Sequence, residues 1–128
     1  MADASAIIRV LTAAERATPF DRYFGAGADI HVPAACDVEV VSVLARAVRA
    51  GLLLDPDART ALLDYTSLPI ERHGHLRLIG RAYLLRDNFG AADAMYVALA
   101  ETLGAYLLTA DRRLARAVRQ HTDVTCLP

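Results

Sequence analysis

Apolar residues recur at helical spacing along most of the chain, and a polar residue interrupts one of the clearest stripes. In the stretch FGAADAMYVALAE, residues 89–101, a helix would place Tyr96, Val97 and Ala100 on one face, in line with Asp93. Apart from the aspartate, that face is apolar. The pattern therefore predicts a buried helical face that begins with a carboxylate.

Helical patterns alternate with short apolar runs, and glycine or proline often separates them. We expect helices at residues 4–17, 35–51, 55–68, 75–90, 91–104 and 112–121, with a short helix or turn at 19–27. We expect strands at residues 29–33, 69–73, 105–111 and 123–128. Asp55 suits the N-cap of its helix, and Gly51 and Gly104 suit the ends of theirs. This alternation predicts a single α/β domain over residues 1–128, with a parallel sheet between layers of helices.

The composition is apolar for a chain of this size. Hydrophobic residues make up 55% of it, and the mean hydropathy is +0.27. No apolar run is long enough for a membrane span, and the N-terminus lacks the pattern of a signal peptide. Cys36 and Cys126 have no metal-ligand spacing, so we expect free, buried thiols in a cytoplasmic protein. The surplus of apolar residues favours a dimer or another partner protein.

Every basic residue other than histidine is arginine. The chain has 14 arginines, no lysine and a net charge of −1. The absence of lysine excludes Schiff-base chemistry and a lysine phosphate clamp. It also counts against receiver domains and haloacid-dehalogenase-like phosphatases, which use a lysine near the phosphate. Since no broad basic field exists, phosphate binding would need arginines or a bound metal ion.

Four acidic residues lie where a parallel α/β sheet usually has its site. Asp3 would follow a first strand, and Asp111 directly follows the apolar run YLLTA. Glu39 and Asp93 fall in the first turns of predicted helices with apolar faces. Because sites in such folds lie at the carboxyl ends of the strands, we expect these four carboxylates to converge on one edge of the sheet.

Each of these acidic residues also has a purely structural explanation. Asp3 and Asp111 each precede a helix and could cap it. Glu39 and Asp93 could be first-turn acids that the helix dipole favours. Together, however, converging carboxylates repel one another and lose hydration unless a cation compensates. Oxygen ligands in that number suit Mg²⁺ or Mn²⁺ and indicate phosphoryl-transfer chemistry.

Other polar residues are open to two interpretations. Ser5 and Thr109 each lie two residues from an aspartate. Their hydroxyls could orient carboxylates or could make only local turn hydrogen bonds. The histidines are scattered, with no metal-ligand spacing beside a cysteine, and we interpret them as surface or strand-edge residues. They are His31, His73, His75 and His121.

Four stretches stand out by their order and spacing along the chain: DASAII, VPAACDVEVVSVLARAVRAG, RDNFGAADAMYVALAE and LLTADRRLARA. Together they resemble the PIN-domain ribonucleases, and most closely the VapC toxins of VapBC toxin–antitoxin systems. The resemblance covers nearly the whole chain. It implies a three-layer sandwich with a five-stranded parallel sheet. The family usually has several apolar strand residues before its first aspartate. Here only Met1 and Ala2 precede Asp3, so either the first strand is very short or the natural start lies upstream.

The resemblance also implies an activity. The family cuts single-stranded RNA with Mg²⁺ or Mn²⁺ at an acidic cluster, which the motifs place here at Asp3, Glu39, Asp93 and Asp111. It implies a homodimer and a VapB-like antitoxin whose C-terminal segment crosses the site. Our hypothesis is a metal-dependent endoribonuclease in which water attacks a phosphodiester, with Arg86, Arg112 and Arg113 as possible phosphate contacts or merely solvated surface residues. A catalytically silent binding module with the same fold is the alternative.

Overall fold

The computed structural model shows helices that alternate with short strands, and it describes residues 1–13 and 17–127. The helices are α1 (Ala4–Thr12), the 3₁₀-helix η1 (Asp21–Tyr23), α2 (Cys36–Arg49), α3 (Asp55–Ser67), α4 (Ile79–Leu84), α5 (Ala91–Leu103) and α6 (Arg112–His121). The strands are β1 (Ile30–Pro33), β2 (Ile70–His73), β3 (Leu107–Leu108) and β4 (Cys126–Leu127). This order confirms the predicted α/β class.

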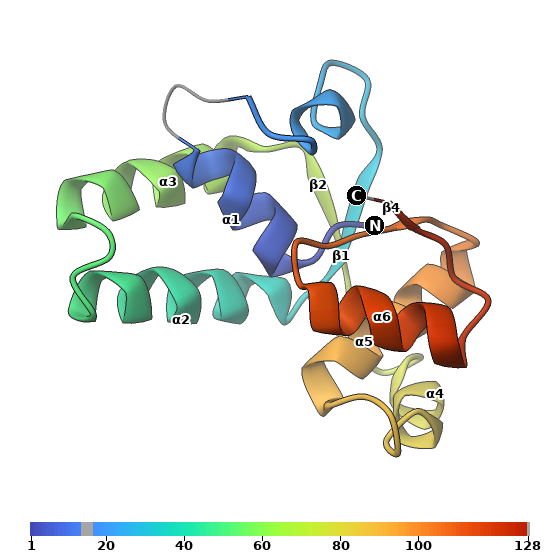
Figure 1. Ribbon diagram of the computed structural model, residues 1–128. Helices are drawn as coiled ribbons and strands as arrows, with labels where there is room; N and C mark the ends of the chain where they lie inside the picture. Colours follow the sequence, from blue (N-terminus) through green and yellow to red (C-terminus); the bar gives the residue numbers. More distant parts are fainter. Residues whose placement is uncertain (14–16, 128) are drawn as a thin grey trace.

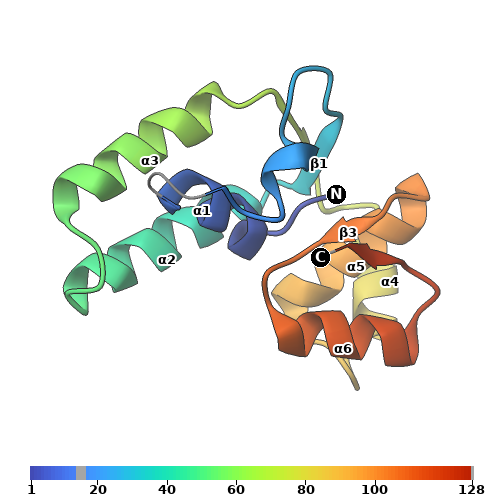
Figure 2. The same cartoon turned by 45° about the horizontal axis from the view of Figure 1, so that its top comes forward.

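The strands lie between two groups of helices. Helices α1, α2 and α3 gather on one side, and α4, α5 and α6 on the other (Figures 1 and 2). Helix α5 has more buried residues than any other described helix, and Tyr96, Val97 and Ala100 are each at most 1% exposed. Gly104 ends this helix in the left-handed conformation, with φ of 59°. The predicted apolar face of residues 89–101 is therefore confirmed as core.

The sheet is shorter than predicted. Strands β1 and β2 pair in parallel, and so do β3 and β4, which gives two separate two-stranded ladders among the described residues. Ala2 links them, because it bridges Leu108 and its N–H donates to the carbonyl of His31 at 3.3 Å. The predicted five-stranded sheet is thus wrong for the described part of the chain. Asp3 already caps α1, so its segment contributes a single bridging residue rather than a strand.

Two helical predictions need correction. The helix expected at residues 75–90 is only α4, since the N–H groups of Leu78 and Ile79 both donate to the carbonyl of His75 in a preceding turn. Asp55 is not an N-cap, because Leu54 occupies that position and the Asp55 carboxylate accepts instead from Nε of Arg59 at 2.7 Å.

The strand expected at 105–111 is confirmed only at residues 107–108, and the one at 123–128 only at residues 126–127.

Some predictions reach beyond the described residues. The helix expected at 4–17 is confirmed only at residues 4–12, as α1; Ala13 and Ala17 are not helical, and residues 14–16 and Pro128 lie outside the described part. Cys36 and Cys126 are free thiols, as predicted, with Cys36 buried and Cys126 half-buried. Among the described residues, no helix combines the length and the apolar character that crossing a membrane requires.

Candidate active site

The four predicted acidic residues line one cavity of about 420 Å³, which we call the acidic cavity. Its acidic members are Asp3, Glu39, Asp93 and Asp111. Asp3 and Asp111 occupy the N-cap positions of α1 and α6, while Glu39 and Asp93 lie in the first turns of α2 and α5. The positive ends of four helix dipoles therefore face the cavity and offset part of its negative charge. The structure thus brings all four predicted residues to the same cavity.

Asp3 is the most firmly held of these carboxylates. It is 5% exposed, and its Oδ1 accepts from the Ser5 hydroxyl at 2.6 Å and from the N–H of Ala6 at 2.9 Å. The Thr109 hydroxyl donates to its other oxygen, Oδ2. The N–H of Ala110 donates to Ser5 Oγ at 2.9 Å, so the loop after β3 is bonded to the start of α1. Ser5 and Thr109 thus orient Asp3 and do more than make local turns.

Asp111 is both a helix cap and a cavity residue. Its Oδ1 accepts from the N–H groups of Arg113 at 2.8 Å and Leu114 at 3.2 Å. Both capping bonds fall on the same oxygen, so Oδ2 is available to a ligand in the cavity. The N–H of Asp111 itself donates to the Thr109 hydroxyl at 3.0 Å, and that hydroxyl contacts Asp3. Capping and a role in the site are therefore compatible at this residue.

Glu39 carries an unpaired oxygen inside the molecule. Its Oε1 and the hydroxyl of Tyr96 are both buried, and neither makes a hydrogen bond of normal geometry among the described residues, although the hydroxyl lies near enough to the carboxylate to lower its pKa. Both residues line the acidic cavity. A buried carboxylate oxygen without a partner costs free energy unless a cation or another donor binds it. The donor set, four carboxylates with one orphaned oxygen, fits a hard divalent cation such as Mg²⁺ or Mn²⁺.

Burial, and then the charges of neighbouring carboxylates, raise the pKa values of Asp3, Glu39 and Asp93. Burial raises the pKa of Asp3 against the hydrogen bonds that it accepts, and the charge of Asp111 raises it further. Burial also raises the pKa of Glu39; the neighbouring Tyr96 hydroxyl opposes this rise, and the charges of Asp93 and Asp3 add to it. For Asp93, burial is again the largest cause, followed by Asp111 and Asp3, while Arg113 opposes the rise in pKa. The cavity therefore concentrates negative charge that a cation would relieve.

A second cavity of about 570 Å³ adjoins the first and is lined by arginines; we call it the arginine cavity. Its arginines are Arg9 on α1 and Arg112, Arg116 and Arg119 on α6. Arg9, Ala110 and Asp111 line both cavities. Within residues 1–13 and 17–127, none of these arginines forms an ion pair. The acidic cavity thus opens beside cationic groups that an anion can reach.

The arginines suggested by the sequence lie in different places. Arg112 lines the arginine cavity, and Arg113 lines a small cavity together with Asp93. Arg86 lies elsewhere: its guanidinium stacks 4.3 Å from the centre of the Tyr83 ring and donates to the Tyr83 carbonyl at 3.1 Å. The structure therefore brings two of the three suggested arginines to the acidic residues. Arg86 lines neither the acidic cavity nor the arginine cavity.

Arg9, Arg116 and Arg119 were not among the residues predicted from the sequence. A signal was present for two of them. Arg112, Arg116 and Arg119 follow the spacing i, i+4 and i+7, which places them along one face of α6. Leu114 and Val118 are the buried residues of that helix. No comparable pattern singles out Arg9, whose position depends on how α1 packs beside the loop after β3.

Known proteins share this fold and sequence over most of the chain. The PIN domain family matches residues 1–120. Ribonuclease VapC3 of Mycobacterium tuberculosis is 42% identical over 115 residues, which cover 90% of this chain and 84% of that protein. Ribonuclease VapC12 of the same organism is 38% identical over 98 residues, which cover 77% of this chain and 76% of that protein.

A solved structure is similar as well. The crystal structure of PAE2754 from Pyrobaculum aerophilum matches with a TM-score of 0.70 at 21% identity, covering 98% of this chain and 80% of that one. At that identity the similarity supports the fold alone. The family match and the ribonuclease relatives each cover most of the sequence. The chain therefore belongs to the PIN-domain family and is a relative of the VapC ribonucleases.

Proposed function

We propose that the protein is a metal-dependent endoribonuclease toxin that cleaves single-stranded RNA by attack of water on a phosphodiester. The observation that carries this proposal is the convergence of four carboxylates on one cavity of about 420 Å³, in a chain related to VapC ribonucleases. The buried, unpartnered oxygen of Glu39 supports a cation there, because a metal ion would satisfy it.

Each acidic residue has a proposed role in holding Mg²⁺ or Mn²⁺. The proposed ligands, direct or through water, are Asp3, Glu39, Asp93 and Asp111. When bound, the ion would neutralise charge on the scissile phosphate and acidify water. Ser5 and Thr109 fix the Asp3 carboxylate through hydrogen bonds to both of its oxygens, so little reorganisation is needed when a ligand arrives. Asp111 keeps one oxygen free of its capping bonds.

The first test of this proposal is the metal dependence of RNA cleavage. Purified protein, free of any antitoxin, is incubated with a broad RNA pool in Mn²⁺, in Mg²⁺ or in EDTA. We expect cleavage only with metal, restored when excess Mn²⁺ follows EDTA, because the carboxylates repel phosphate without a cation. Cleavage that persists in EDTA would contradict the proposal. No cleavage, together with no Mn²⁺ binding by calorimetry, would favour the catalytically silent binding module.

The arginine cavity is the proposed path of the RNA backbone. Arginine forks suit phosphate oxygens, and a backbone that leaves the acidic cavity past Arg9 would meet the arginines of α6. Arg113 also belongs to α6 but lines a separate cavity together with Asp93, so it could contact the phosphate on the far side of the cut. Arg86 is less suited to contact an RNA phosphate, because its guanidinium stacks on the Tyr83 ring.

We expect the double variant Arg116→Gln/Arg119→Gln to bind RNA more weakly while kcat changes little, because these residues line the arginine cavity but not the acidic one. Each lost phosphate contact should reduce the slope of log K against log salt by about 0.7, so the pair should reduce it by about 1.4. Fluorescence anisotropy with a labelled RNA measures this. The control is Arg49→Gln/Arg77→Gln, which removes the same charge at exposed residues away from both cavities. Equal salt slopes for the two double variants would contradict the proposed path.

We also propose a homodimer and a VapB-like antitoxin as partners. The support is a set of large apolar side chains that are at least half exposed on α2 and α4. They are Val38, Val41, Ile79, Tyr83 and Leu84. The two sets lie on opposite sides of the strands, and large apolar side chains exposed on a helix often belong to interfaces. Light scattering of the purified protein tests the dimer, and a monomer at micromolar concentration would contradict it.

A further inference from the structure

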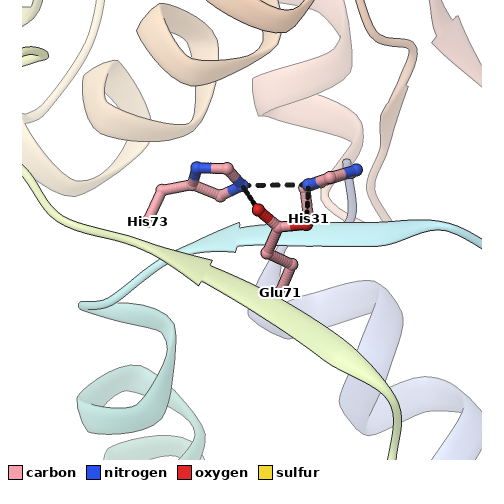
Figure 3. A group of neighbouring side chains, drawn as sticks. All are labelled: His31, Glu71 and His73. Carbon is pink, nitrogen blue, oxygen red and sulfur yellow. Dashed lines mark hydrogen bonds and ion pairs between the residues drawn. The ribbon is translucent and has the colours of Figure 1, made fainter.

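Two histidines and a glutamate meet on the paired strands β1 and β2. The parallel register pairs His31 with Glu71 and Pro33 with His73. Because side chains alternate along a strand, Glu71 and His73 lie on the same face of β2, and His31 points to that face from β1. Figure 3 shows the three side chains on one side of the two strands, with their polar atoms directed toward one another. None of the three lines the acidic cavity.

The three side chains form a compact triangle. Nδ1 of His31 lies 2.9 Å from Nε2 of His73. One carboxylate oxygen of Glu71 lies 3.6 Å from His31 Nδ1, and the other lies 3.7 Å from His73 Nε2. Bonds of about 2.0–2.1 Å to a tetrahedral zinc ion place neighbouring ligand atoms roughly 3.3 Å apart. The three observed separations lie on both sides of that value, so small side-chain rotations would admit the ion.

A fourth residue favours the tautomer that a metal needs. The carboxylate of Asp29 lies 3.0 Å from Nε2 of His31, the ring nitrogen opposite the one in the triangle. A carboxylate beside one nitrogen of a histidine favours the proton on that nitrogen and leaves the other as a lone pair. Nδ1 of His31 is therefore directed, as an electron-pair donor, toward His73 and Glu71. The pairing of carboxylate and histidine is the one that commonly supports zinc ligands.

We propose that His31, Glu71 and His73 form a second metal site, which takes Zn²⁺ or a chemically similar divalent transition metal. Two imidazoles and one carboxylate suit zinc, with water as the fourth ligand, whereas Mg²⁺ prefers a shell of oxygen atoms. The site joins β1 to β2, a strand that pairs only with β1 among the described residues and whose side chains are largely exposed. Zinc would fasten this strand to the rest of the sheet, separately from the proposed catalytic metal.

Cobalt spectroscopy tests this site without reference to RNA cleavage. Untagged protein, stripped with EDTA and then freed of it, is titrated with Co²⁺, which absorbs strongly in the visible range when tetrahedral and only weakly when octahedral. We expect a tetrahedral band in the wild type and in Asp93→Asn, with Zn²⁺ displacing the cobalt. The band should be lost, or the affinity lowered at least about tenfold, in His73→Gln. His121→Gln, at an exposed histidine outside the triangle, is the matched control and should keep the band.

A further variant separates metal binding from folding. The Glu71 side chain is 64% exposed, so Glu71→Gln should fold normally and still bind Co²⁺ at least about tenfold more weakly than the wild type. The proposal would be overturned by a wild type that shows no tetrahedral band. It would also be overturned by a band that both Glu71→Gln and His73→Gln retain at full affinity. In either case, the contact between His31 and His73 would be a simple hydrogen bond.

Discussion

Asp93→Asn is expected to lower the rate of RNA cleavage at least about 100-fold, because the loss of one ligand carboxylate removes several kcal/mol of stabilisation from a metal-dependent reaction. Asp93 lies in the first turn of α5, lines the acidic cavity and is half-buried beside the other acids. Asparagine has nearly the same shape, so the helix and its core face should be retained. Initial rates in saturating Mn²⁺, measured on the RNA that the wild type cleaves best, would show the loss.

The matched control is Asp57→Asn. Asp57 lies in the first turn of α3, just as Asp93 lies in the first turn of α5, but it is exposed and lines neither the acidic cavity nor the arginine cavity. The Asp57→Asn variant should cleave RNA at the wild-type rate. If Asp93→Asn were as active as this control, the acidic-site proposal would fail, and Asp93 would be an ordinary first-turn acid that the helix dipole favours.

The sequence predicted the helices and the acidic cluster well because both depend on local signals. The apolar stripe of α5, the arginine-rich α6 and the left-handed glycine at Gly104 each follow from patterns within a few residues. Asp3 and Asp93 come from motifs that also fix the starts of their helices. They meet in one cavity because the N-terminal ends of α1 and α5 both lie beside Asp111.

The sheet and the histidine triangle could not be predicted in the same way. Strand β3 is only two residues long because Asp111 leaves it to cap α6 and Thr109 bonds Asp3, which lies 106 positions earlier in the sequence. His31 and His73 are 42 residues apart and meet only through the register of β1 and β2. The sequence holds no signal of that register. Histidines interpreted only as surface or strand-edge residues therefore gave no indication that His31 and His73 are in contact.

The same Asp93→Asn change is expected to stabilise the metal-free protein. Burial and the charges of Asp111 and Asp3 raise the pKa of Asp93, so the folded state holds a proton there more tightly than the unfolded chain does. Ionisation near neutral pH therefore destabilises the fold, and this cost disappears as the pH falls through the raised pKa. Asparagine removes the charge at every pH. We expect the Tm in EDTA at pH 7.5 to rise by about 3 °C, the change that roughly 1 kcal/mol produces in a domain of this size.

Three comparisons make this result decisive. The gain in Tm should shrink as the pH is lowered, because the wild-type carboxyl then becomes protonated as well. Mn²⁺ should raise the Tm of the wild type more than that of Asp93→Asn, since the ion binds the folded state and the variant lacks a proposed ligand. Asp57→Asn should show no gain. An unchanged or lower Tm for Asp93→Asn in EDTA would mean that the carboxylates do not repel one another as the cavity implies. A variant that is more stable than the wild type and yet inactive, however, cannot owe its inactivity to unfolding, so the lost carboxylate itself would be what cleavage requires.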